Sequence, residues 1–187
     1  MTNRCVFHVA LLLCFSTTAL SRSYRLLRLQ QNRSSMACQK LLTHLNGRPE
    51  SCIRDRMDFE VPEEIKLPQQ LQKEDAAFII YEMLHNVLEI FTRDLSNTGW
   101  DEAIIRSLFV QVHQQMDRLR TTLAGQLEEV NLTWGNVMTT LQLKSYYWRI
   151  IRYLKDKEYS SCAWTVVCVE ILRNFSFINR LTDFFQK

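Results

Sequence analysis

The chain has 187 residues, of which 47% are hydrophobic, and its formal net charge at neutral pH is only +3. This length suits one domain that can bury a sizeable core, and that core should supply most of the stability. Basic residues alternate with acidic ones, without the clustered runs typical of nucleic-acid binding, so we expect no nucleic-acid partner.

Residues 1–21 have the pattern of a secretory signal peptide. Arg4 supplies a positive charge, Val9–Phe15 is a short apolar run, and small residues around Ala19 suit cleavage. The alternative is that these residues form a buried N-terminal helix. From the signal-peptide pattern we expect a secreted, extracellular protein whose domain spans 22–187. The apolar run is too short to cross a bilayer and no later segment is expected to do so, which predicts no membrane insertion.

The three prolines, Pro49, Pro62 and Pro68, lie close together in the sequence. Proline inside a helix costs about 3 kcal/mol. Their clustering therefore predicts one long irregular connection, at about 46–70, in a chain that is otherwise helical.

Apolar residues recur at helical spacing on both sides of this connection. The predicted helices span about 23–45, 70–93, 99–128, 133–156 and 160–184. Thr98, followed by Asp101, is the predicted N-cap of the third. The fourth should bury a stripe that includes Val137 and Leu141. A long first crossover lets two neighbouring helices run parallel. The expected fold is therefore all-α: a five-helix, up-up-down-down bundle of the cytokine type.

No catalytic or cofactor-binding motif occurs in the sequence. His44, His85 and His113 fall on three different predicted helices without the spacing of metal ligands. We therefore expect no enzyme activity, no cofactor and no metal site.

Four cysteines follow the leader, and the sequence does not choose among their three full pairings. A Cys52–Cys162 bridge would hold the proline-rich connection against the last helix, stabilising the fold by roughly 4–5 kcal/mol on the chain-entropy model. Cys38 and Cys168 would then form either a second disulfide or two free thiols. Cys168 lies beside the apolar stripe of its helix, so we expect it to be partly accessible.

Three Asn-x-Ser/Thr sequons are candidate glycosylation sites. Asn131 lies in a predicted loop and is the best of them. Asn32 lies in the first predicted helix, and Asn174 lies beside apolar Phe175 in the last one, where a glycan is least expected.

The segment from Tyr146 to Trp164 reads Tyr-Tyr-x-Arg-Ile-x-x-Tyr-Leu, then seven residues, then Cys-Ala-Trp. This pattern resembles the signature of the type I interferon family. Cys52–Phe59 resembles the crossover motif of that family, and the leader and Ser96–Trp100 are similar to its mammalian beta branch. The resemblance covers the whole chain.

The resemblance implies a secreted cytokine that bridges the two chains of the type I interferon receptor. Bridging would activate JAK–STAT signalling and an antiviral, antiproliferative and immunomodulatory state. We expect a monomer, with self-association at most weak. The alternatives are another four-helix cytokine with a different receptor, and a secreted lipid carrier built from amphipathic helices.

The resemblance also implies two sets of receptor contacts. By matched position, the contacts with the high-affinity chain are Ile53, Arg56, Leu172, Arg173 and Ser176. The contacts with the low-affinity chain are Leu88, Glu89, Arg93, Ile104, Phe109, His113 and Lys144. Cys168 departs from the family pattern, because relatives commonly carry a receptor-facing arginine there. A Cys38–Cys168 bridge would staple the high-affinity surface.

Overall fold

The structure is a computed structural model. It describes the backbone of residues 2–186 except 67, 69–70 and 124–133, and side chains within 24–66, 68, 71–123 and 137–186. The described residues contain long helices and no strand. The long helices are α1 (Thr2–Leu45), α3 (Lys73–Phe91), α4 (Glu102–Thr122), α6 (Trp134–Asp156) and α7 (Ser161–Thr182). The short ones are η1 (Pro49–Asp55), α2 (Glu63–Lys66) and η2 (Asp183–Gln186).

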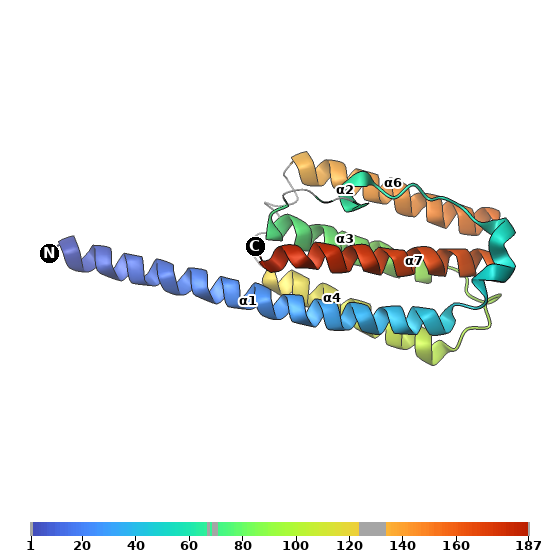
Figure 1. Ribbon diagram of the computed structural model, residues 1–187, viewed down its shortest axis with the longest axis horizontal. Helices are drawn as coiled ribbons and strands as arrows, with labels where there is room; N and C mark the ends of the chain where they lie inside the picture. Colours follow the sequence, from blue (N-terminus) through green and yellow to red (C-terminus); the bar gives the residue numbers. More distant parts are fainter. Residues whose placement is uncertain (1, 67, 69–70, 124–133, 187) are drawn as a thin grey trace.

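The long helices lie side by side in one bundle (Figure 1). Helices α1, α3 and α6 run in one direction, and α4 and α7 run in the other. Side-chain contacts agree with these directions: Arg28 of α1 pairs with Asp183 just after α7, whereas the thiol of Cys168 near the start of α7 donates to the Leu42 carbonyl.

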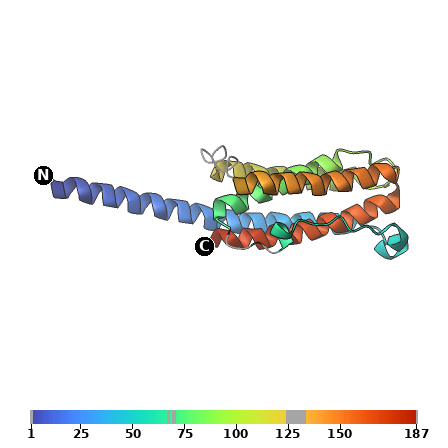
Figure 2. The same cartoon turned by 90° about the horizontal axis from the view of Figure 1, so that it is seen from above.

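The proline-rich connection between α1 and α3 runs back along the bundle, which is why these two helices are parallel. It is less irregular than the sequence predicts, because η1 and α2 form within it. Both views place η1 at the end of the bundle opposite the C-terminus (Figures 1 and 2).

Helix α1 begins at Thr2, well before the predicted start at about 23. Its first half extends beyond the bundle in both views (Figures 1 and 2). The reason is local: residues 1–46 contain neither proline nor glycine, so nothing in the sequence interrupts the helix. Among the described side chains, packing of α1 against the bundle begins at Tyr24, which is buried against Phe185.

The N-cap of α4 differs from the prediction. Asp101 caps the helix by accepting a hydrogen bond from the Ala103 amide at 2.7 Å. Thr98 instead accepts from the Trp100 amide within the preceding turn. Asp101 is the residue directly before the first helical one, where a carboxylate also interacts favourably with the helix dipole.

The core is rich in aromatic side chains. Trp164, Tyr146, Tyr147, Phe59 and Phe175 are among its largest fully buried members. The predicted stripe on α6 is wrong at its beginning, because Val137 and Leu141 are exposed. The buried hydrophobic side chains of α6 are Leu143, Tyr146, Tyr147, Ile150, Tyr153 and Leu154.

A buried polar network joins α6 to α7. The Tyr146 hydroxyl donates to Glu170 Oε1 at 2.6 Å, and the Tyr147 hydroxyl donates to the amide oxygen of Asn174. The Asn174 amide nitrogen donates to the Tyr146 oxygen at 2.6 Å. Tyr146, Tyr147, Glu170 and Asn174 therefore have partners for their buried polar groups, which removes most of their desolvation penalty.

This network corrects one glycosylation candidate. Asn174 is fully buried and its amide is engaged on both sides, so the structure leaves no room for a glycan there. Asn32 is half-buried on α1, and Asn131 lies outside the described residues.

Cys38 and Cys168 are free thiols, and the expected accessibility of Cys168 is wrong because both side chains are fully buried. Cys168 lies beside the apolar stripe of α7, but α1 covers that side and the thiol meets the Leu42 carbonyl. The amide of Gln115 donates to the Cys38 sulfur at 3.4 Å. Burial raises the pKa of each thiol to about 12.

The expectation that no later segment is apolar enough to cross a membrane is also wrong. Ser161–Gln186 meets that test by length and composition. Most of it is buried inside the bundle, however, because α7 contacts α1, α3, α6 and η1. Its apolarity is that of a central core helix.

Stability should fall at alkaline pH, because buried phenols must ionise. Burial raises the pKa of Tyr24 and Tyr153 to about 12, and raises those of Tyr146 and Tyr147 well above the usual value. The folded state therefore holds these protons more tightly than the unfolded chain, whose phenols titrate near pH 10. Denaturant melts should show stability from this source fully present below pH 10 and lost as pH rises towards 12. Tyr153→Phe should shrink the loss, and an equal loss would contradict this assignment.

The free thiols should be unreactive in the native protein. We expect alkylation of Cys38 and Cys168 at neutral pH only after denaturation, because burial and a raised pKa both suppress the reactive thiolate. Non-reducing peptide mapping should recover Cys52 and Cys162 as one linked pair. A Cys38–Cys168 peptide, or rapid native alkylation, would contradict the structure.

Candidate functional site

A groove of about 720 Å³ lies between the crossover and helix α7. Its walls combine apolar side chains with charged ones. The lining residues are Pro49, Glu50, Cys52, Ile53, Arg56, Met57, Asp58, Phe59, Lys66, Thr165, Val166, Val169, Glu170 and Arg173. On the α7 side, Thr165, Val169 and Arg173 are spaced four residues apart and so share one helix face.

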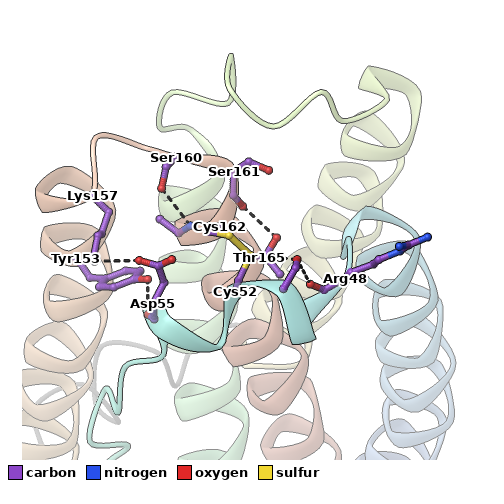
Figure 3. Close-up of a disulfide and its surroundings, with 11 residues drawn as sticks. Arg48, Cys52, Asp55, Tyr153, Lys157, Ser160, Ser161, Cys162 and Thr165 are labelled. Atoms are coloured by element: carbon purple, nitrogen blue, oxygen red, sulfur yellow. Dashed lines mark hydrogen bonds and ion pairs between the residues drawn. A yellow bond between two sulfur atoms is a disulfide. The ribbon is translucent and has the colours of Figure 1, made fainter.

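The disulfide Cys52–Cys162 joins η1 to the start of α7 (Figure 3), and Cys52 is part of the groove lining. Cys162 lies in the first turn of α7, two residues after the N-cap Ser160, which accepts from the Ala163 amide. Cys52 lies in η1, where Ser51 donates to the Arg48 carbonyl. The bridge therefore joins two locally ordered turns and fixes where the crossover starts along α7.

Helix α6 and Lys157, the residue directly after it, hold residues 55–60 of the crossover through three side chains spaced four residues apart. Arg149 donates to the carbonyls of Phe59 at 3.0 Å and Glu60 at 2.9 Å. The Tyr153 hydroxyl donates to the Asp55 carbonyl at 2.7 Å, and Lys157 Nζ lies 2.9 Å from Asp55 Oδ1 (Figure 3). We call Arg149, Tyr153 and Lys157 the α6 clamp.

The clamp binds a segment whose backbone has no regular hydrogen-bond pattern of its own. Glu60 has a positive φ of 54°, an unfavourable conformation for a residue other than glycine. The Arg149 guanidinium donates hydrogen bonds to the carbonyls of Phe59 and Glu60, on either side of this kink. Side-chain donors thus replace the backbone donors that a helix would supply to these carbonyls.

The structure brings together three of the five residues expected to contact the high-affinity chain. Ile53, with 63% of its surface exposed, lines the groove together with Arg56 and Arg173. Leu172 is half-buried on α7. Ser176 is exposed one turn beyond the groove, where its hydroxyl accepts from Gln39 of α1. These last two lie beside the groove rather than in it.

Glu170 connects the groove to the buried network. Its Oε2 lies 3.7 Å from Arg173 Nη1, while its Oε1 accepts from Tyr146. The Arg173 guanidinium also lies 5.4 Å from the Phe177 ring centroid. Arg173 is thus held on two sides, which reduces the side-chain entropy lost when it binds a partner.

Sequence reasoning missed several residues of the groove. Met57 and Val169 are exposed apolar side chains in its lining, and Glu170 is an acidic side chain buried at its base. Met57 lies within the Cys52–Phe59 motif, so the sequence gave a reason to consider it as a groove residue. Nothing in the sequence pointed to Glu170, because a lone glutamate on a helix is usually solvated.

The residues expected to contact the low-affinity chain are spread over three helices. Phe109 and His113 of α4 line a second hollow, together with Trp100, Ile105 and Val110. Glu89 of α3 and Arg93, which lies two residues after that helix, form an ion pair at 2.7 Å. Leu88 and Ile104 are half-buried against the core, and Lys144 is exposed on α6. The structure therefore does not gather this set in one cavity.

The groove has the chemistry of a binding surface. Its apolar side chains and arginines can contact a partner, but no nucleophile and base meet in it. No group of His, Cys, Asp and Glu side chains that could hold a metal ion occurs among the described residues.

The family model of the interferon alpha/beta domain matches residues 27–185, almost the whole bundle. The chain belongs to the interferon alpha/beta family. Interferon beta of Macaca fascicularis is 59% identical and that of Homo sapiens 58% identical, each over 186 residues that cover all of both chains. Interferon beta of Mus musculus is 48% identical over the same length.

These matches confirm the resemblance of the Tyr146–Trp164 signature and of the leader and Ser96–Trp100. This interferon is a member of a family of cytokines of innate immunity, not of enzymes. The clamp residues lie within Tyr146–Trp164, and Cys52–Phe59 forms much of the crossover wall of the groove, whereas its α7 wall, Thr165–Arg173, follows the second motif.

Arg149→Ala should loosen the crossover without dismantling the bundle. The variant loses hydrogen bonds to two carbonyls, so we expect the free energy of unfolding to drop by about 1–3 kcal/mol. Hydrogen exchange of amides in 55–61 should also become faster. Arg152→Ala is the matched control on the same helix, since the ion pair and the cation–π contact that Arg152 makes among the described residues are with Asp156 and Trp148 of α6. Equal exchange in both variants would contradict the clamp.

Proposed function

We propose that this interferon is a secreted cytokine, released after removal of residues 1–21, that bridges the two chains of the type I interferon receptor. The high-affinity chain binds the groove between the crossover and α7. The low-affinity chain binds α3, α4 and α6. Bridging brings the receptor-associated kinases together and activates JAK–STAT signalling, which produces the antiviral, antiproliferative and immunomodulatory state.

The observation that carries this proposal is the convergence of Ile53, Arg56 and Arg173 on one groove. They come from segments far apart in the sequence, and the disulfide and the α6 clamp hold those segments together. The resemblance to type I interferons implied these residues before the structure placed them. A structural role alone does not explain exposed Ile53 and Met57 beside two arginines.

The chemistry of the groove suits a protein partner with acidic and apolar side chains. Arginine offers a planar fork of donors that matches a carboxylate, and it is enriched at interface hot spots. Exposed Ile53, Met57 and Val169 supply apolar area around the two guanidinium groups. Apolar area around fixed charged donors is a common composition of interface centres.

Two separate surfaces support bridging. The groove uses the crossover and α7, whereas the second set uses α3, α4 and α6, so the two sets share no helix. Both receptor chains can then occupy one cytokine at once, and one monomer suffices.

The bundle supports the proposed cytokine arrangement. Helices α1, α3, α4 and α7 follow one another as up, up, down and down, and α6 is the fifth helix. The fully buried aromatic core does not suit the alternative of a lipid carrier, which would need apolar helix faces free for lipid.

Arg56→Ala should weaken binding to the isolated high-affinity receptor chain by more than about 1 kcal/mol, because a charged hydrogen-bonding group in the groove is lost. Surface plasmon resonance with the immobilised ectodomain measures this. Arg54→Ala is the matched control: Arg54 is equally exposed and lies two residues away, outside the groove lining. Thermal melts should be the same for both variants.

An unchanged dissociation constant for Arg56→Ala would remove this residue from the contact set. Absence of binding by the unmodified protein to either receptor chain would overturn the proposed function itself. A response that persists in cells lacking the type I receptor would favour a different cytokine receptor.

A further inference from the structure

Helix α1 has an exposed side on which apolar and basic residues alternate. The helix packs against α4, α7 and η2, and the side that faces away from them is open to solvent. Exposed residues on this side recur at intervals of three and four, which places them on one stripe of the helix. We call this stripe the outer face of α1; it consists of Leu26, Leu29, Arg33, Met36 and Lys40.

The apolar residues of this face are large and poorly covered. Leu26 leaves 57% of its surface in solvent, Leu29 66% and Met36 55%. None of them belongs to the core cluster or to the hydrophobic side chains that pack against it. A single exposed leucine is ordinary, but three such side chains on one stripe of one helix form a patch of the kind that marks an interaction site.

The charge of this helix has one sign. All 20 acidic residues of the chain follow position 49, so α1 carries bases and no acid of its own. Arg33 and Lys40 are exposed on the outer face, and Arg25 is exposed at its margin. Apolar residues interleaved with bases on one side of a helix are typical of helices that bind a membrane surface.

Acids from other elements contact α1 away from this face. Asp183, directly after α7, lies 3.0 Å from Arg28, and Glu74 of α3 accepts from the hydroxyl of buried Tyr24. Tyr24 and Arg28 are not on the stripe, and neither contact involves one of its bases. The positive charges of the outer face therefore remain available to an anionic partner.

We propose that the outer face of α1 binds the surface of membranes that contain anionic phospholipids, with the helix parallel to the bilayer. The apolar side chains then enter the boundary between headgroups and acyl chains, while Arg33 and Lys40 extend to the lipid phosphates and carboxylates. The helix lies on the membrane and does not cross it. This binding is separate from the proposed receptor contacts, since neither of those sets includes a residue of α1.

An anionic membrane is the partner that suits both parts of this composition. A sulfated polysaccharide would pair with the bases but would leave three large apolar side chains in water. A second copy of the chain, docked face to face about a two-fold axis, would bury the apolar side chains but would bring the bases of the two copies together. A bilayer with anionic headgroups accommodates the apolar and the basic side chains at once.

The position of this face leaves the start of α7 free. Arg28 pairs with Asp183 and Tyr24 packs on Phe185, so Leu26 and Leu29 lie at the end of the bundle where α7 finishes, opposite η1 (Figures 1 and 2). The Cys52–Cys162 bridge lies at the other end. Variants of the two leucines should therefore leave binding to the high-affinity receptor chain unchanged.

The experiment measures sedimentation of the secreted protein with lipid vesicles. We expect it to sediment with vesicles of mixed phosphatidylserine and phosphatidylcholine, not with phosphatidylcholine alone, and to be released by added salt. Leu29→Ala should lower the partition coefficient about fivefold, because apolar area is removed from the buried side. Arg33→Glu should lower it about tenfold or more, because an attractive charge becomes a repulsive one.

Each variant has a matched control on another element. Leu141→Ala changes a leucine that is 56% exposed on α6, and Arg54→Glu makes the same change of charge at an exposed position of η1. Both controls should sediment like the unmodified protein. Melting temperatures check that all four variants are folded, and binding to the isolated receptor ectodomains, measured without vesicles, should be the same for Leu29→Ala and Arg33→Glu as for the unmodified protein.

The inference is overturned if the unmodified protein does not sediment with the phosphatidylserine vesicles, or if the controls weaken sedimentation as much as the variants of the outer face. Heparin binding that Arg33→Glu abolishes, without vesicle binding, would assign the face to a sulfated polysaccharide. Self-association that Leu29→Ala abolishes, again without vesicle binding, would assign it to a second copy. Because receptor binding is measured without vesicles, failure of the proposed function is a separate result.

Discussion

The attachment of the crossover to α6 and α7 is the constraint on which the candidate site depends. Without it, residues 46–61 would be an ordinary proline-containing loop, whose ordering costs about 1–2 kcal/mol per residue in backbone entropy. The Cys52–Cys162 bridge restricts that entropy in the unfolded chain, and the α6 clamp satisfies the carbonyls of the folded one. The disulfide and these polar contacts together order the crossover, as backbone hydrogen bonds order a helix.

The same constraint explains the position of α3. Because the crossover spans the bundle before α3 begins, α3 starts at the end where α1 also enters, and the two helices run parallel. The surfaces on α3 and α4 then lie on helices other than those that form the groove. The path of one loop determines both where the groove forms and which helices remain free for a second partner.

Local patterns predicted much of this fold because they depend on local physics. Helical periodicity located every long helix, and the prolines located the crossover. Two of the errors came from tertiary contacts: α1 covers the side of α7 on which Cys168 lies, and Val137 and Leu141 of α6 lie beyond the core. Arg56 and Arg173 were reached through family motifs, whereas the Cys52–Cys162 bridge was one of the pairings that the sequence left open. Periodicity cannot reveal that Glu170 is buried, that Arg149 binds two carbonyls, or that Trp148 is exposed, because each depends on which helix lies opposite.

A hydrogen bond from Tyr146 to Glu170 and an ion pair from Glu170 to Arg173 connect the core to the groove. Alanine scanning alone therefore cannot tell whether a loss of binding arises from the core or from the groove. Truncating Tyr146, which solvent never reaches, releases the carboxylate that orients an exposed arginine. A buried tyrosine would then score as a receptor contact, and a map of the epitope drawn from such a scan would include an interior residue.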